Sequence, residues 1–256
     1  MGIRVLARSV LLGVAVLLST VSTVQAAVIS YTLLDASNNV LARANFSTST
    51  NRLDVQLQNF IVNPASFNQA LTDLEFTFSL NQSNGQPFSG ALSTTNAQHV
   101  RTILGDGSFN VADSPPPGYN FGWSLQNGVN DGLGVGMRLC VLCAGGTGPN
   151  ALLGEPGAFN LYSNADGTIK GSATDNPFLA GLMSFTLDVP GLTHDAYVDS
   201  AFFSFQTAVL QGHCYNNLDV SCQPERRIPE PSTLTLMAAG LIGLAVFAWR
   251  ARRPTT

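Results

Sequence analysis

The histidines and paired carboxylates are the residues of this chain that could carry out catalysis. The histidines are His99, His194 and His213. His194 precedes Asp195, but neighbouring side chains on a strand point to opposite faces, so this pair makes a poor catalytic dyad. Asp73 and Glu75 lie two apart on one face of an expected strand, where two carboxylates could hydrolyse a glycan or simply be solvated. Because the sequence also lacks Gly-x-Ser-x-Gly and His-Glu-x-x-His motifs, we expect no enzymatic activity.

Two short stretches could bind a ligand. Tyr119, Phe121 and Trp123 cluster beside a loop, where their rings could stack on sugars or close the end of a β-sandwich, and we favour the second interpretation. Asn164 and Asp166 resemble the start of a calcium loop, but the bidentate glutamate of an EF-hand is missing, so we expect a turn. The sequence therefore predicts no metal site and no cofactor.

The N-terminal segment has the pattern of a secretory signal peptide. Arg4 and Arg8 give a positive start, and residues 10–18 form a short apolar core. Small residues follow at the expected cleavage point between Ala26 and Ala27. We therefore expect residues 1–26 to be removed during export by the Sec machinery, leaving an exported domain over residues 27–224.

The C-terminal segment, residues 225–256, ends in an apolar run followed by arginines. Residues 234–249 contain no charge, and with Thr233 they can form a transmembrane helix over 233–249. Sixteen helical residues span only about 24 Å of a hydrocarbon core of roughly 30 Å, so the span is short. The basic cluster should remain in the cytoplasm because positive charge resists translocation. This cluster consists of Arg250, Arg252 and Arg253.

A proline-rich triplet precedes the apolar run. Pro229 and Pro231 lack backbone donors and disfavour helix and strand, so the segment should be extended, with the Glu230 carboxylate displayed. A simple single-pass anchor with a proline hinge is the alternative interpretation. An accessible segment next to the bilayer would also suit a membrane-bound processing enzyme.

The order of this triplet, the apolar run and the terminal arginines resembles the PEP-CTERM sorting signal of Gram-negative bacteria. The matching residues are Pro229, Glu230, Pro231, Arg250, Arg252 and Arg253. The resemblance implies recognition by exosortase, an integral-membrane cysteine transpeptidase, and cleavage near the triplet. The same tail is also known as the ice-binding protein C-terminal domain, but no regular Thr-rich face is visible, so ice binding is not expected.

The four cysteines are Cys140, Cys143, Cys214 and Cys222. An exported domain meets an oxidising compartment, so disulfides are expected, with the local pairs Cys140–Cys143 and Cys214–Cys222 as the first choice. Four cysteines allow three connectivities, so cross-pairing stays open. A thioredoxin-like interpretation of the Cys-Val-Leu-Cys stretch lacks the strand–helix context that it needs.

Residues 27–225 contain five basic and fifteen acidic residues, a net charge of −10. Such an acidic region offers no surface for nucleic acid or anionic lipid. The carboxylates leave room for calcium, although no motif assigns a site.

The exported region has the pattern of an all-β protein. Short segments rich in β-branched and aromatic residues are separated by Gly, Pro and Asn, which favours an antiparallel β-sandwich or jelly roll. Residues 64–71 could form a helical turn, and 105–136 is expected to be rich in loops. The expected strands are 28–34, 40–46, 53–58, 74–80, 97–104, 134–142, 159–162, 183–189 and 201–210.

These features predict a non-enzymatic, exported cell-surface or extracellular matrix protein. We expect exosortase and the Sec machinery as partners, together with exopolysaccharide. The precursor would be a transient single-pass membrane protein, and the product would reach the cell surface or the medium. The alternatives are a carbohydrate-binding module and a polysaccharide hydrolase.

Overall fold

The computed structural model describes residues 28–113, 115, 118–130, 135–143, 149–205, 210–215 and 225–227, the last two ranges as backbone. The predicted signal peptide (1–26) and transmembrane helix (233–249) lie outside these ranges. Within them, no helix is long enough and apolar enough to span a membrane.

The described chain is mostly β-sheet, as predicted from the sequence. Two short 3₁₀ helices, η1 (Phe67–Gln69) and η2 (Ala158–Asn160), are its only helical elements among these residues. The strands are β1 (Val28–Leu34), β2 (Val40–Ser49), β3 (Arg52–Asn59), β4 (Leu71–Phe78), β5 (Ala91–Ile103), β6 (Phe109–Asp113), β7 (Ser124–Val129), β8 (Gly136–Cys140), β9 (Leu152–Leu153), β10 (Phe178–Asp188), β11 (Val198–Phe205), β12 (Leu210–Tyr215) and β13 (Glu225–Arg227).

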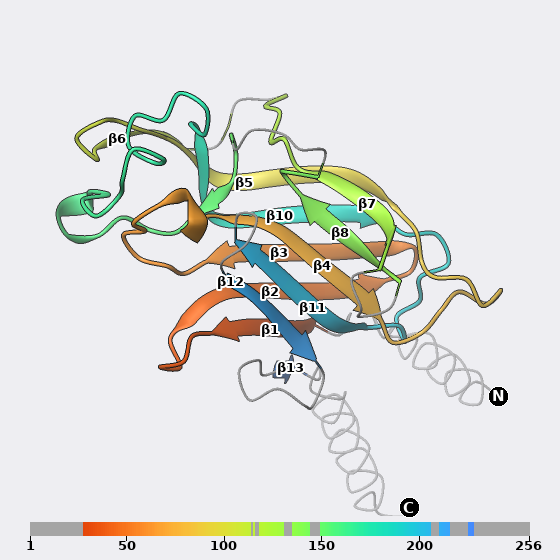
Figure 1. Cartoon of the computed structure of the whole chain (residues 1–256). Coiled ribbons are helices and arrows are strands. Elements are labelled where there is room, and N and C mark those ends of the chain that lie inside the picture. Colours follow the sequence, from red (N-terminus) through yellow and green to blue (C-terminus); the bar gives the residue numbers. More distant parts are fainter. Residues whose placement is uncertain are drawn as a thin grey trace, which may run out of the picture.

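The strands form two layers, one in front of the other in Figure 1. The rear layer runs β13-β1-β2-β3-β10-β5-β6, and the front layer runs β12-β11-β4-β8-β7. The two-residue strand β9 pairs with β10 of one layer and with β4 of the other. Its parallel pairing with β10 is the exception among the described ladders, which are otherwise antiparallel.

The main hydrophobic core lies between these layers. The alternation of apolar and polar residues along β2 and β3 turns one side of each strand inward. The rings of Phe46 and Phe76 meet across the gap with centroids 5.2 Å apart, and the Tyr31 hydroxyl donates a 2.9 Å hydrogen bond to the carbonyl of Val198. Burial of each large apolar side chain stabilises the fold by about 1.5–3 kcal/mol.

A second, smaller cluster of buried residues packs around Tyr162. Arg101 is buried beside it and donates hydrogen bonds to the Tyr162 hydroxyl at 2.8 Å and to the Glu155 carboxylate at 2.9 Å. The Tyr162 hydroxyl in turn donates to the Gly154 carbonyl at 2.9 Å. Burial raises the pKa of Tyr162 to about 12, although Arg101 opposes this shift.

Three sequence predictions need correction. The expected strand at 159–162 is wrong, because η2 lies there and Phe159 has a φ of 59° and is 94% exposed. The single strand expected at 201–210 is divided between β11 and β12. The loop-rich middle contains two strands, β6 and β7, which the alternation of residue types did not reveal. The helical turn expected within 64–71 is present as η1.

Candidate functional site

A groove of about 490 Å³ lies between β5 and the segment that leads into β7. Its volume falls in the range of about 300–1,000 Å³ that is usual for small-molecule sites. It is lined by Ser93, Thr94, Thr95, Asn96, Pro115, Gly118, Tyr119, Asn120, Phe121 and Trp123. The aromatic cluster predicted from the sequence therefore forms one wall of the groove, and β5 forms the other.

The three aromatic residues have different roles in this wall. Trp123 is only 6% exposed, and its ring packs against core Phe185 with centroids 5.3 Å apart. Tyr119 and Phe121 are half-buried and meet edge to face at 5.1 Å. Trp123 thus anchors the segment in the core, which agrees with the interpretation that these rings close the end of a β-sandwich. The other two rings border the groove.

Asn150 holds the aromatic segment in place. Its side-chain carbonyl accepts a 2.6 Å hydrogen bond from the Tyr119 hydroxyl, and its backbone carbonyl accepts one of 2.9 Å from the Trp123 indole. Gly122 allows the turn between the rings, because its φ of +69° is unfavourable for other residues. Sequence reasoning missed Asn150, and no local motif would have identified it, since it contacts the segment only through the fold.

The opposite wall is a polar stretch of β5, residues 93–96. Ser93, Thr94 and Asn96 are exposed, and Thr95 is half-buried. On one side this stretch pairs with β10, whereas β6 pairs only with residues 99–103, so residues 93–96 have no strand on the other side among those described. Asn127 fixes β7 to the start of β5 by exchanging two 2.9 Å hydrogen bonds with the Gly90 backbone.

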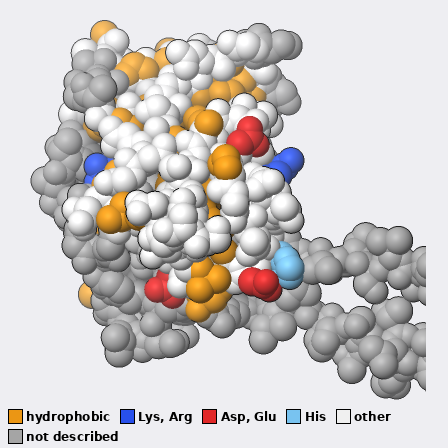
Figure 2. Space-filling view, turned by 90° about the vertical axis from the view of Figure 1, so that its right-hand side faces the viewer, with side chains coloured by type: hydrophobic (Ala, Val, Ile, Leu, Met, Phe, Trp, Pro, Cys, Tyr) orange, Lys and Arg blue, Asp and Glu red, His pale blue; other side chains and the backbone are white. Residues whose placement is uncertain are grey.

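Among the residues that the structure describes, no charged side chain lines the groove. Tyr119 is the one titratable side chain among the described lining residues, and burial raises the pKa of its hydroxyl, so the residue is neutral at physiological pH. Figure 2 shows one face of the molecule, on which charged side chains are few and scattered among uncharged atoms. The groove therefore offers hydroxyl groups, amides and aromatic rings without a net charge.

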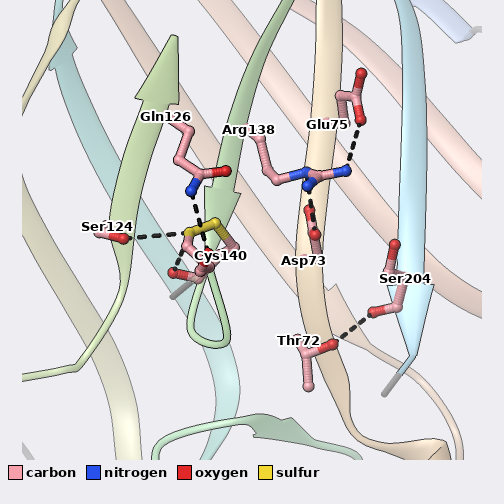
Figure 3. A network of polar contacts seen from close by, with 9 residues as sticks. Thr72, Asp73, Glu75, Ser124, Gln126, Arg138, Cys140 and Ser204 are labelled. Atoms are coloured by element: carbon pink, nitrogen blue, oxygen red, sulfur yellow. Dashed lines mark hydrogen bonds and ion pairs between the residues drawn. A yellow bond between two sulfur atoms is a disulfide. The ribbon is translucent and has the colours of Figure 1, made fainter. Parts of the chain in front are cut away.

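The carboxylates considered for catalysis are held by an arginine from the next strand (Figure 3). Arg138 of β8 forms ion pairs of 3.2 Å with Asp73 and of 3.2 Å with Glu75. The side chain of Glu75 is fully buried, and that of Asp73 is 17% exposed. The interpretation of a solvated pair was therefore wrong, because the antiparallel register places Arg138 opposite Glu75.

The other titratable candidates lie apart from the groove. His194 and Asp195 form an exposed 3.1 Å contact at a turn, so the argument from opposite strand faces does not apply to them. The Asp166 carboxylate accepts hydrogen bonds from the amide and hydroxyl of Thr168, which is the turn that was predicted. His99 lies on β5, away from the lining, and His213 lies on β12, described as backbone alone. The described residues contain no group of three or more His, Cys, Asp or Glu side chains suited to a metal ion.

The predicted disulfide between Cys140 and Cys143 is confirmed. It closes the turn after β8, and the Ser124 hydroxyl of β7 lies 3.2 Å from the Cys143 sulfur (Figure 3). Cys214 belongs to β12, whose side chains are not described, and Cys222 lies outside the described residues. Their pairing stays a prediction.

The two ends of the described chain lie on neighbouring strands. β13 pairs antiparallel with β1, so that Arg227 is opposite Val28. The expected signal-cleavage residues Ala26 and Ala27 lie outside the described residues, immediately before β1. The expected sorting residues follow β13 and also lie outside them; they are Pro229, Glu230, Pro231, Arg250, Arg252 and Arg253.

Comparison with known families places this chain among proteins that carry a C-terminal sorting signal. Residues 227–253 match the family model of the PEP-CTERM protein-sorting motif. The chain is therefore an exported protein that exosortase sorts to the cell surface. Neither the curated proteins nor the solved structures give a match to the chain.

Proposed function

We propose that this protein is a non-enzymatic component of the cell surface or extracellular matrix that associates with exopolysaccharide. The PEP-CTERM motif at residues 227–253 carries the proposal, because it directs the domain to the place where such polymers accumulate. In this scheme the Sec machinery exports the chain and residues 1–26 are removed. The helix at 233–249 holds the precursor until exosortase cleaves near Pro229–Pro231.

The exported domain, which we take to be an antiparallel β-sandwich, suits this role. Its described side chains favour a structural role over catalysis, since the carboxylates Asp73 and Glu75 are both ion-paired with Arg138 within the sheet. A hydrolase would need two carboxyl groups that face the substrate from opposite sides of the bond to be cleaved. A carbohydrate-binding module remains the second candidate, because the groove beside β5 combines aromatic rings with hydroxyl and amide groups.

Deletion of the host exosortase tests the proposal. We expect the deletion strain to accumulate an uncleaved precursor in the membrane fraction, whereas wild-type cells release a shorter form that co-fractionates with exopolysaccharide. The sorting role would be refuted by a product whose size and location are the same in both strains. The association with exopolysaccharide would be refuted if the wild-type product separated from the polymer at low salt.

A further inference from the structure

We propose that the groove between residues 93–96 and the segment 118–123 binds an uncharged polysaccharide chain. This inference deepens the proposed surface function and rests on it for the source of the ligand. It concerns a defined site on the exported domain, whereas the sorting motif lies elsewhere in the chain.

The polar wall of the groove presents side chains that can hydrogen-bond to a ligand. The side chains of Ser93, Thr94, Thr95 and Asn96 make no hydrogen bond to any other described residue. In contrast, the side-chain oxygen and nitrogen of Asn127 and of Asn150 are each hydrogen-bonded. Free hydroxyl and amide groups can both donate and accept, as sugar hydroxyls do. The side of this stretch that faces away from β10 adds backbone groups that no described strand occupies.

The aromatic wall of the groove presents ring surface to a ligand. Tyr119 and Phe121 keep part of their surface accessible, and both line the groove. The hydrogen bond from Tyr119 to Asn150 fixes its ring before any ligand arrives, so binding would cost little side-chain entropy. Aromatic rings that are held in place in this way offer apolar faces on which the C–H faces of a pyranose ring can stack.

The charge of the domain and the length of the polar wall favour a neutral polymer as the ligand. The described lining residues include neither a cation for an anionic group nor a carboxylate for calcium, and residues 27–225 carry a net charge of −10. The acidic domain therefore disfavours anionic polymers, and the described lining offers no carboxylate to a bridging metal. Residues 93–96 extend over roughly 10 Å of strand, which exceeds one sugar ring and suits a stretch of chain.

A binding measurement on the protein as the host accumulates it, precursor or processed, tests this proposal. Retention by affinity electrophoresis should be clear with purified neutral polymers such as dextran, laminarin and mannan, and weak with alginate and hyaluronan. EDTA should not change it. Three results would each overturn the proposal. They are binding that requires calcium, binding to acidic polymers alone, and binding to an unstructured polypeptide but to no glycan.

Matched variants assign the binding to the groove. Phe121→Ala should weaken binding to the best neutral polymer about tenfold, and Asn96→Ala roughly threefold to tenfold. The controls Phe159→Ala and Asn81→Ala change the same residue types at exposed positions outside the groove and should bind as the wild type does. Asn96→Ala lies on the surface and should fold normally, so unchanged binding by this variant and by a folded Phe121→Ala would refute the site.

The outcome is separable from that of the sorting proposal. Exosortase processing is read from the mass of the protein, and glycan binding from retention in the gel. Normal processing with no retention would refute the groove alone, and retention of an unprocessed chain would refute the sorting scheme alone.

Discussion

Replacement of Arg138 by Met should destabilise the exported domain strongly, because it removes the one cation that both Asp73 and Glu75 contact in Figure 3. Met keeps most of the apolar length of the arginine side chain. The change therefore leaves packing largely intact and isolates the charge. If the two carboxylates have a structural role and not a catalytic one, removing Arg138 must lower the free energy of unfolding.

The expected magnitude follows from burial. Removing one partner of a buried ion pair costs about 3–5 kcal/mol. The side chains of Arg138 and Asp73 are 24% and 17% exposed, so water can solvate the Asp73 carboxylate and reduce this cost. Glu75 is fully buried, so water does not reach its carboxylate in the folded state. We therefore expect a loss of about 2–4 kcal/mol, or about 5–15 °C in Tm for a domain of this size.

Urea unfolding followed by tryptophan fluorescence measures the effect, since buried Trp123 reports on the core. Arg52→Met is the matched control, because Arg52 pairs with Asp54 at 2.7 Å on the exposed surface, where ion pairs contribute little. Adding Glu75→Gln to Arg138→Met should recover part of the loss by removing the buried charge. Equal stability of Arg138→Met and Arg52→Met would refute the structural interpretation of the pair.

Two further predictions concern stability. The pKa of Tyr162 is raised to about 12 by burial, so the folded state keeps its proton while the unfolded chain loses it near pH 10. The contribution of Tyr162 amounts to about 2–3 kcal/mol; it is complete below pH 10 and is lost as the pH rises through 12. The stability difference between wild type and Tyr162→Phe, measured by urea unfolding, should therefore be smaller at pH 11 than at pH 8 by about 1–1.5 kcal/mol. A difference that does not change with pH would contradict this assignment. The Cys140–Cys143 disulfide closes a loop of sequence separation 3, so Cys140→Ala/Cys143→Ala should cost only about 2 kcal/mol; a loss beyond about 4 kcal/mol in the same assay would show that the disulfide does more than close its turn.

The strands with clear alternation were predictable from the sequence. β1 and β3 were expected at nearly their observed bounds, because each buries one face and the period of two is visible in the residue types. β7 was missed because its sequence, Ser-Leu-Gln-Asn-Gly-Val, is exposed or half-buried at every position and shows no apolar face. The residues 159–162 resemble a strand in composition, but Phe159 lies in solvent in a left-handed conformation that composition does not reveal.

The candidate site was only partly predictable for a similar reason. The aromatic cluster is contiguous in sequence, so its presence beside a loop could be inferred. The polar wall comes from β5, about 25 residues earlier, and becomes a site only because the sheet leaves residues 93–96 without a second neighbour among the described strands. Arg138 is likewise separated by 63 residues from Glu75, and only the register of β4 and β8 brings them together.

The intact mass of the final protein from wild-type cells tests the sorting mechanism most directly. We predict a product that begins at Ala27 and ends near Pro229–Pro231, without Trp249 or the arginines that follow it. This product should be absent from cells lacking exosortase. Recovery of a final form that still carries Trp249 and Arg250 to Arg253 would contradict it.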